Sequence, residues 1–600
     1  MDMRLDSRIV SRRDLDFVLF ELLEVDALCA RPRFAEHSRA TFAAALDTAL
    51  EIAAEKFAPH NRRSDESEPR FDGERVQMIP EVKEAVRAFA EAGFIAATYD
   101  YEQGGMQLPF SIALACLGIF RGANTATDAY GSLTVGAADL IHEFGSEAQK
   151  ARYLAPMLAG RFLGTMVLTE PQAGSSLADI TATATPNADG TYALKASKIF
   201  ISAGDHELAE NIVHLVLAKL PGAPRGVKGI SLFIAPKYRV NDDGSVGCRN
   251  DVALAGLIHK MGFRGTTSTM LNFGEHGECV AELVGEPHEG LAYMFQMMNG
   301  ARIGVGLGAT ALGYTGYLHA LDYARERRQG RTGKDPAEPQ VPIIRHADVR
   351  RMLLAQKAYT EGALALCLYA GTLVDRQRHA ETEVERSDAG LLLDLLTPVV
   401  KAWPSQYCVE ANSLAIQVHG GYGYTRDYPV EQFFRDNRLN AIHEGTNGIQ
   451  ALDLLGRKVF AAQGAPLGLL EREIEGTLAQ ARVAGDEEIA LHAEALSHAW
   501  QEIVDTTRVI GMQLRRDTRL ALANAHVYLE VFGHTLVAWL WLRQALAAHR
   551  ALAAEPSDFY RGKLAAARYF FRWELPATAP KHALLRSLDT SCLEMQEAWF

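Results

Sequence analysis

The sequence predicts a mainly α-helical protein that carries a central β domain. Apolar residues recur at three- and four-residue spacing from about residue 39 to residue 157, and again from about residue 293, as in amphipathic helices. Between these two regions, short β-branched segments alternate with turn residues, as in antiparallel strands. The 600 residues are enough for three or four domains with a large core.

The first helical region is expected to form an N-terminal helical extension over residues 1–38 and an α domain over residues 39–162. Phe42, Leu46 and Leu50 share one face of a predicted helix. Pro80 suits the first turn of another helix, because proline lacks the backbone N–H that such a turn leaves without a partner. Residues 111–118 and 131–144 continue the helical pattern.

The β domain is expected over residues 163–288. Residues 165–169 form a short apolar run, and residues 180–185 and 192–202 flank the turn residues of 187–190, which predicts a β-hairpin. Further strands are expected at residues 212–217, 230–234, 253–258 and 270–273.

A four-helix bundle is expected over residues 289–460. The four long helical patterns cover residues 307–328, 349–373, 389–418 and 449–459. Pro398 and Pro404 should kink or split the third of these helices, because proline cannot donate the helical hydrogen bond.

A fourth unit, an extra C-terminal helical domain, is expected over residues 467–600. Residues 461–466 have the composition of a linker. The most apolar stretch, residues 531–542, is too short to span a bilayer. It predicts a buried bundle helix, with a membrane-surface patch as the alternative.

Composition and charge exclude some classes of protein. Hydrophobic content of 48% and charged content of 22% are typical of a soluble globular protein, and the formal charge of −13 argues against a nucleic-acid binder. No two of the seven cysteines have metal-ligand spacing, so we expect no metal site. Dispersed thiols and the absence of an apolar segment in residues 1–13 predict a cytoplasmic protein with at most peripheral membrane contact.

Three segments carry the functional signal. They are Leu168–Ser175 (LTEPQAGS), Gln417–Gly423 (QVHGGYG) and Ile442–Gln450 (IHEGTNGIQ). In this order they resemble the acyl-CoA dehydrogenase family, whose members are flavoenzymes that desaturate acyl-CoA thioesters. The resemblance covers about residues 39–459 and implies that family's fold. The extra C-terminal unit resembles the long branch that includes the 3-methylmercaptopropionyl-CoA dehydrogenases and some bacterial fatty acyl-CoA dehydrogenases.

The resemblance implies FAD as the cofactor. Thr169, Gly174 and Ser175 match the segment that offers donors to the isoalloxazine edge. Phe200 and Ser202 stand where many relatives carry tryptophan and threonine, so an aromatic face and a hydroxyl are both kept. For Phe200 taken alone, ordinary core packing on a strand is the alternative.

The sequence lacks the G-x-G-x-x-G motif that follows a strand in a Rossmann site, so a site of that type is not supported. The resemblance implies that the adenosine half of FAD reaches a neighbouring subunit. Arg327 matches the arginine that meets the pyrophosphate, a role that suits its planar guanidinium. A solvated charge at a helix end is the alternative for this residue. The shared site implies a homo-oligomer, at least a dimer. The implied cofactor contacts are Leu168, Thr169, Gly174, Ser175, Phe200, Ser202, Arg327, Gln417, Gly420, Gly421 and Thr446.

Glu444 matches the catalytic base of the family. The reaction removes a proton from the α-carbon and a hydride from the β-carbon of the thioester, so the base must be a carboxylate in a water-poor cleft. Some branches place the base beside the residue that matches Arg302, but Ala301 stands there in this chain. Without the other segments, Glu444 would read as a carboxylate at a helix N-terminus. The implied substrate contacts are Ser175, Asn299, Arg302 and Gly445.

The predicted function is α,β-desaturation of a medium- or long-chain fatty acyl-CoA, with 3-methylmercaptopropionyl-CoA as the alternative substrate. The resemblance implies an electron-transfer flavoprotein as the electron acceptor. An acyl-CoA oxidase or flavin monooxygenase on the same scaffold is a second interpretation. A non-catalytic flavin-binding protein for DNA protection or complex assembly is a third, which the presence of Glu444 and the acidic charge both disfavour.

Overall fold

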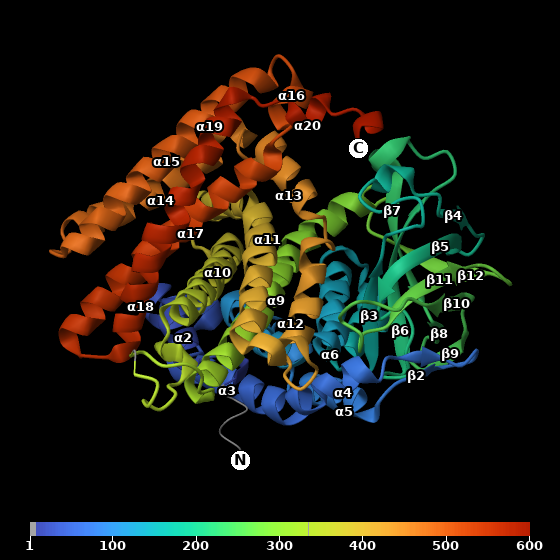
Figure 1. The fold of residues 1–600 in the computed structure, drawn as a ribbon. Coiled ribbons are helices and arrows are strands. Elements are labelled where there is room, and N and C mark those ends of the chain that lie inside the picture. Colours follow the sequence, from blue (N-terminus) through green and yellow to red (C-terminus); the bar gives the residue numbers. More distant parts are fainter. Residues whose placement is uncertain (1–7, 334) are drawn as a thin grey trace.

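The computed structural model describes residues 8–333 and 335–600, and it confirms a mainly helical protein with a central β domain. In Figure 1 the β-sheet lies on one side of a bundle of long helices, and the C-terminal helices lie on the other. The active-site segments predicted from the sequence lie in the β domain and in the bundle.

The N-terminal part is helical, as expected, except for a short antiparallel pair of strands, β1 (Arg70–Phe71) and β2 (Val76–Gln77), which was not predicted. Its main helices are α2 (Arg12–Asp16), α3 (Arg39–Ile52), α5 (Pro80–Glu91) and α6 (Phe110–Phe144). The two helical segments expected at 111–118 and 131–144 are joined in α6, which is interrupted at Asn124 by non-helical dihedral angles. The side chain of Asn124 donates to Phe57 O (3.2 Å) and accepts from Thr127 N (3.1 Å), so it replaces the helical bonds lost there.

The central domain contains an eight-stranded sheet in the order β10-β11-β5-β12-β7-β6-β3, with β4 paired to β5 and β6. The strands are β3 (Phe162–Val167), β4 (Thr183–Pro186), β5 (Tyr192–Ser202), β6 (Asn211–Lys219), β7 (Ile230–Pro236), β10 (Val252–Leu257), β11 (Ser268–Phe273) and β12 (Cys279–Val284). The expected hairpin is confirmed, since β4 and β5 pair antiparallel. A separate pair, β8 (Tyr238–Val240) and β9 (Val246–Arg249), was not predicted.

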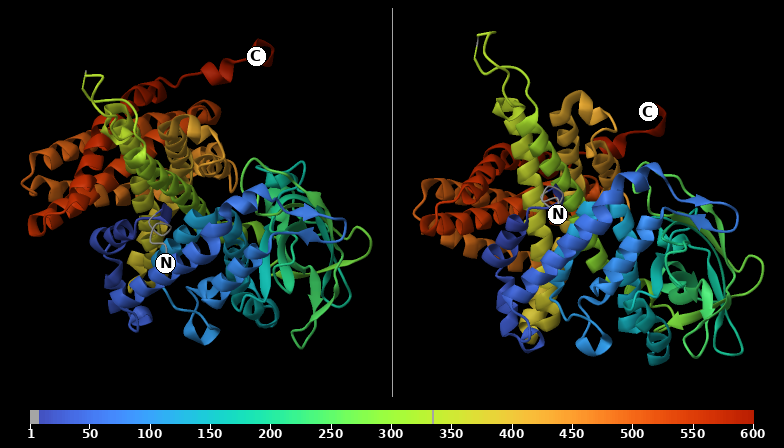
Figure 2. Two further views of the ribbon diagram at one scale, coloured as in Figure 1. Left: turned by 60° about the horizontal axis from the view of Figure 1, so that its bottom comes forward. Right: turned by 90° about the horizontal axis from the view of Figure 1, so that it is seen from below.

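The bundle is built on three long helices, α9 (Gly290–Glu326), α10 (Ala347–His379) and α11 (Glu383–His419). The fourth expected helix, at residues 449–459, is formed by α13 (Asn447–Asp453) and by the π-helical turn Leu454–Lys458 that continues it. The helix α11 is not split and continues through Pro398 and Pro404. The connection that follows α9, coloured light green, projects from the body in both views of Figure 2.

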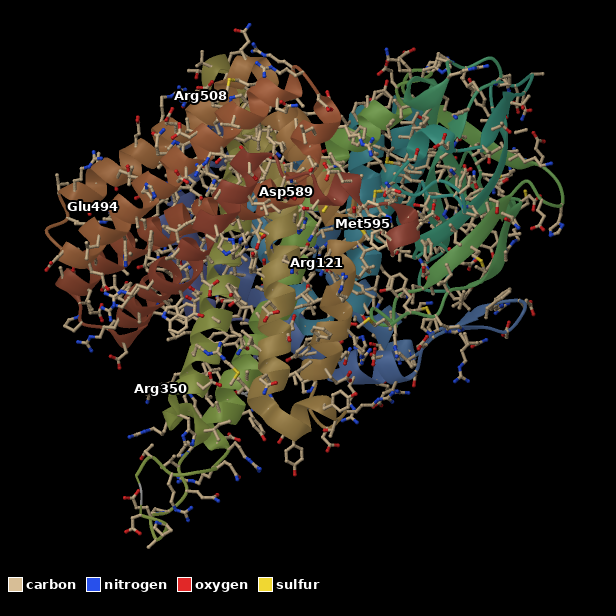
Figure 3. All side chains as sticks on the ribbon, turned by 45° about the horizontal axis from the view of Figure 1, so that its top comes forward. Arg121, Arg350, Glu494, Arg508, Asp589 and Met595 are labelled. Carbon is tan, nitrogen blue, oxygen red and sulfur yellow. The ribbon has the colours of Figure 1, made fainter. Side chains whose placement is uncertain are left out.

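The C-terminal unit contains α14 (Ala465–Arg482), α15 (Glu487–Leu514), α17 (Ala525–Ala554), α18 (Asp558–Tyr569) and α19 (Ala579–Ser587). Residues 531–542 of α17 are buried throughout, which confirms a buried helix. Charged side chains such as Glu494 and Arg508 project from the outer side of α15 (Figure 3). Within residues 8–333 and 335–600, every helix is too short or too polar to cross a bilayer.

Candidate active site

The turn that carries Glu444 has a strained backbone held by its neighbours. Glu444 has φ 54° and Gly445 has φ 83°, so two successive residues are in the left-handed region. This conformation is uncommon for a residue with a side chain and persists where surrounding contacts fix it. The side-chain amide of Gln450 donates to Glu444 O (3.1 Å) and Gly445 O (3.2 Å). A side chain at Gly445 would meet this amide, because its Cβ would lie 2.7 Å from Gln450 Nε2.

The carboxyl of Glu444 lies in a desolvated but accessible position. The residue is half-buried, and burial raises its pKa against the opposing charges of Arg302 and Lys401. His443 is neutral, because burial lowers its pKa to about 3. A half-buried carboxyl with a raised pKa is typical of a functional cleft, where a carboxylate gains basicity.

The two cations come from helices that cross at close range. Gly306 of α9 lies against the backbone of α11, where a Cβ on this glycine would be 1.9 Å from Val400 O. Pro404 cannot donate to that carbonyl, which is four residues before it in the helix. Lys401 follows Val400, and Arg302 lies about one turn before Gly306. The crossing therefore explains why both cations reach the same carboxyl.

The predicted substrate residues lie along α9 and around the base. Arg302 is 6% exposed, and its Nη1 lies 3.2 Å from Asp453 Oδ2, so its charge is paired in the protein interior. Asn299 is half-buried about one turn before it on α9. Thr446 caps α13 by accepting from Ile449 N (3.3 Å).

A loop of the β domain closes on the base turn. The rings of Phe263 and His443 are 6.5 Å apart, edge to face. The backbone N–H of Phe263 donates to Asp436 (2.6 Å), which precedes the turn. The base therefore lies at the junction between the bundle and the β domain.

The predicted flavin segment follows strand β3 and is exposed at its tip. Leu168 and Thr169 are half-buried, whereas Gly174 and Ser175 are exposed. No heavy atom lies within 4 Å of a Cβ placed on Gly174, so a ligand could approach its backbone closely.

Phe200, in strand β5, combines a left-handed backbone with an exposed side chain. Its backbone has φ 59°, and its side chain is 62% exposed, so the alternative of core packing is wrong for this residue. Ser202 is half-buried, pairs with Ser268 across the sheet and accepts a bond from Thr165 Oγ1 (2.7 Å) at its carbonyl. A strained backbone that displays an aromatic face is a feature of binding sites.

A second group of predicted residues gathers at the far end of the bundle. Arg327 ends α9, and its guanidinium lies 5.8 Å from the ring centre of Tyr422. Gln417, Gly420 and Gly421 are exposed, and both glycines face open space. Arg327 is about 37 Å from Arg302 along the axis of α9, at 1.5 Å per residue. The structure therefore places two groups of predicted residues well apart within one chain.

Comparisons with known proteins bear on the same residues. The family model described as "Acyl-CoA dehydrogenase, N-terminal domain" matches residues 41–161, "Acyl-CoA dehydrogenase, C-terminal domain" matches residues 288–459, and "Acetyl-CoA dehydrogenase C-terminal like" matches residues 470–596. The chain is 37% identical to the 3-methylmercaptopropionyl-CoA dehydrogenase of Ruegeria pomeroyi, over 97% of this chain and 98% of that protein. The chain belongs to the acyl-CoA dehydrogenase family. It is therefore an oxidoreductase of acyl-CoA thioesters.

Other relatives cover the full length of this acyl-CoA dehydrogenase. The broad-specificity linear acyl-CoA dehydrogenase FadE5 of Mycobacterium tuberculosis is 36% identical, over 98% of this chain and 99% of that protein. The crystal structure of Caenorhabditis elegans ACDH-11 in complex with C11-CoA has a similar fold, with a TM-score of 0.76 at 18% identity, and covers 99% of this chain and 93% of that one.

Sequence reasoning missed a buried ion pair in the predicted flavin segment of this acyl-CoA dehydrogenase. Lys198 Nζ, on β5, donates to Glu170 Oε1 and to Leu168 O, each at 2.9 Å, and both charged side chains are buried. Burial acts to raise the pKa of Glu170, but the Lys198 charge and the donors of Thr181 outweigh it and lower the pKa to about 2. The signal in the sequence is a lysine inside the apolar run that contains Phe200.

Proposed function

We propose that this chain is an FAD-dependent acyl-CoA dehydrogenase that converts an acyl-CoA thioester to trans-2-enoyl-CoA with Glu444 as the base. The observation that carries this proposal is the position of Glu444, on a braced and strained turn where its carboxyl is desolvated. The α-hydrogen of a thioester is weakly acidic, so the reaction needs a carboxylate of raised basicity beside it.

The residues of the chain would act as follows. Glu444 takes the α-proton, and Gln450 fixes the turn that aims the carboxyl. The backbone N–H of Glu444 is a donor for the thioester oxygen, where negative charge develops as the proton leaves. When bound, FAD would supply the acceptor for the hydride from the β-carbon.

The residues of the β domain fit a flavin. Phe200 displays an aromatic face, the open backbone at Gly174 permits close approach, and Thr169 and Ser202 offer hydroxyls. We assign the isoalloxazine ring to this group, with Leu168, Ser175 and Thr446 completing it. Ser175 and Gly445 are also assigned to the substrate, with Asn299 and Arg302 behind the thioester.

The distance between the two groups of residues supports a dimer. One flavin bound at Phe200 near the base would lie far from Arg327 of the same chain, given the 37 Å or so between Arg302 and Arg327 along α9. We infer that Arg327, Gln417, Gly420 and Gly421 hold the pyrophosphate and adenosine of the FAD in a second copy. Their exposure in a single chain agrees with this role.

Replacing Glu170 by glutamine should release FAD and destabilise the β domain. The change leaves Lys198 buried without its carboxylate, which costs about 3 kcal/mol. The matched control is Glu210→Gln, which breaks a pair with Arg161 whose side chains are 47% and 51% exposed, and which should cost under about 1 kcal/mol. Flavin content and thermal unfolding measure both effects. If the two variants retain the same amount of FAD, Glu170 does not organise the site.

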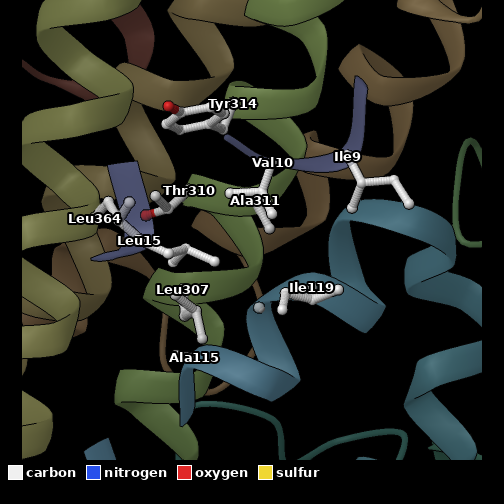
Figure 4. Close-up of a pocket in the computed structure, with 11 residues that line it drawn as sticks. Ile9, Val10, Leu15, Ala115, Ile119, Leu307, Thr310, Ala311, Tyr314 and Leu364 are labelled. Carbon is white, nitrogen blue, oxygen red and sulfur yellow. The ribbon is translucent and has the colours of Figure 1, made fainter. Parts of the chain in front are cut away.

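A small apolar pocket lies beside α9. It is enclosed by the N-terminal segment and helices α6, α9 and α10 and has a volume of about 20 Å³, so an acyl chain would have to widen it (Figure 4). Leu307, in its wall, lies about 7.5 Å along α9 from Arg302. We propose that a medium- or long-chain acyl group extends along α9 toward this cavity. The alternative substrate is 3-methylmercaptopropionyl-CoA, because the relative that is 37% identical is named as a dehydrogenase of this thioester.

Dehydrogenase rates across an acyl-CoA series decide the substrate. We expect kcat/KM to rise from the short-chain and methylthio substrates to the medium- and long-chain ones. Ala311 lines the pocket, so Ala311→Leu should lower kcat/KM about 10-fold or more for long chains, because excluding two or more methylenes of the acyl chain forfeits about 0.8 kcal/mol for each. Rates with the short substrates should not change, which makes them the internal control. If kcat/KM is highest with 3-methylmercaptopropionyl-CoA, that thioester and not a fatty acyl-CoA is the preferred substrate.

We further propose that electrons pass to an electron-transfer flavoprotein and that the enzyme works in the cytoplasm. The oxidase interpretation differs in its use of oxygen. Its signature would be hydrogen peroxide formed in proportion to turnover.

A further inference from the structure

Lys401 is a buried lysine with an unusual partner. It is fully buried in α11, and within the described residues its ammonium has one side-chain hydrogen bond, to Asn447 Oδ1 (3.3 Å). The three other fully buried lysines in the described chain each lie within 3 Å of a carboxylate: Lys198 with Glu170, Lys237 with Asp205 and Lys563 with Glu361. A buried cation without a bonded anion is costly, so its retention points to a role beyond packing.

The charges around Lys401 point to Glu444. Burial lowers the pKa of Lys401 to about 7, Glu444 acts to raise it, and Arg302 acts to lower it. On the α9 side, the charge of Arg302 is already paired with Asp453. Glu444 is therefore the carboxylate with which the Lys401 charge interacts.

Two neighbouring histidines are neutral, and Arg121 of α6 is a further cation, paired with Asp128 at 3.0 Å, whose charge also acts on His443. His443, on the base turn, has its pKa lowered to about 3 by burial, and the Lys401 charge adds to this effect. From α17, His534 contacts Trp403, two residues from Lys401, and burial lowers its pKa to about 4. No second anion from these elements competes for the ammonium.

The backbone ties Lys401 to the base. Asn447 is the first residue of α13 and lies three residues after Glu444 on the same turn. The close crossing at Gly306 and Val400 fixes α11 at this point, so the lysine cannot move away without breaking the helix packing. The hydrogen bond to Asn447 then holds the ammonium beside the turn.

We propose that Lys401 is a positioning residue of the reaction, whose ammonium, anchored by Asn447, is the counter-charge that keeps the half-buried Glu444 ionised. The inference rests on the proposed function, because it takes Glu444 as the base. Loss of the positive charge raises the pKa of Glu444, so less of it is carboxylate at a given pH. The rate then falls at low pH and recovers at high pH, whereas a purely structural defect lowers the rate at every pH.

The test is the pH profile of kcat/KM for Lys401→Gln and Lys401→Arg. Glutamine can keep the bond to Asn447 but carries no charge, and arginine keeps the charge. At low pH, kcat/KM rises with pH as Glu444 ionises; this part of the profile is the acid limb. We expect the acid limb of Lys401→Gln to shift by about one pH unit toward higher pH. At a fixed low pH, this shift lowers the fraction of Glu444 present as carboxylate about tenfold. Lys401→Arg should keep the limb of the wild type. An acid limb that Lys401→Gln leaves in place would overturn the inference.

A second variant and a second readout keep the test independent of folding and turnover. Asn447→Asp offers Lys401 a competing carboxylate, so the acid limb of kcat/KM should again shift to higher pH. An acid limb at the pH of the wild type would contradict the inference. Carbodiimide labels protonated carboxyls, so mass spectrometry of the Glu444 peptide against pH reports its protonation directly. If Glu444→Gln retains full activity, the proposed function itself fails. If Glu444→Gln is inactive while these limbs stay unmoved, only the role of Lys401 fails.

Discussion

Replacing Glu444 by glutamine is expected to lower kcat by about 10³- to 10⁴-fold, the upper part of the range for loss of a general base. Glutamine has nearly the same size and can accept the same contacts, but it cannot take a proton from the α-carbon. The pH profile carries a further expectation. Because burial raises the pKa of Glu444, the wild-type rate should rise with pH. The midpoint of this rise should lie above the ordinary pKa of glutamate.

The control for this variant is the integrity of the protein. The strained backbone at Glu444 is braced through main-chain oxygens, so Glu444→Gln should keep its flavin content and its Tm. A matched substitution at Glu488, which pairs with Arg568 in the C-terminal unit, should change kcat by less than twofold or so. Equal losses in both variants would indicate a structural effect.

Replacing Lys563 by methionine is expected to destabilise the protein by about 4–5 kcal/mol. Lys563, on α18, is fully buried and lies 2.8 Å from Glu361 Oε2 of α10 and 3.1 Å from Gln544 Oε1 of α17. It also pairs with Asp14 of the N-terminal segment, which accepts from Tyr314 (2.8 Å). The substitution leaves Asp14 and Glu361 without their shared cation, and Glu361 keeps only its pair with Lys357.

The effect of Lys563→Met should spread over three parts of the chain, because the cluster joins α2, the bundle and the C-terminal unit. Thermal unfolding and limited proteolysis would detect release of both ends. The control is Arg568→Met on the same helix, whose pair with Glu488 has side chains 51% and 27% exposed and should contribute under about 1 kcal/mol. Similar Tm values for the two variants would contradict the role of the buried cluster.

The order of domains and most strands could be predicted from periodicity alone, because helices and strands of this length repeat their apolar residues clearly. The short strands of β8 and β9, with three and four residues, leave no periodic signal. The interruption of α6 at Asn124 could not be located from the sequence, since the side chain there bonds to Phe57 of another segment. In α11, the sequence shows Pro404 but does not show that the backbone of α9 lies against Val400.

The candidate site was predicted in part. Motifs identified the segments of Glu444, Thr169 and Arg327, since these are local in sequence. Lys198 and Lys401 could not be assigned roles, because their partners come from other elements. Both lysines lie inside apolar runs of the sequence, which is the one signal that they share. Only the structure shows that both are buried, and a buried charge needs a compensating partner.

The most direct test of the account is a single turnover without oxygen. The yellow protein is mixed with one equivalent of a fatty acyl-CoA, while flavin absorbance and the mass of the thioester are followed. We predict that the wild type bleaches as the thioester loses one α-hydrogen and one β-hydrogen, and that Glu444→Gln binds the thioester but stays yellow. A Glu444→Gln protein that bleaches at the wild-type rate, or a wild type that leaves the thioester intact, would contradict the account.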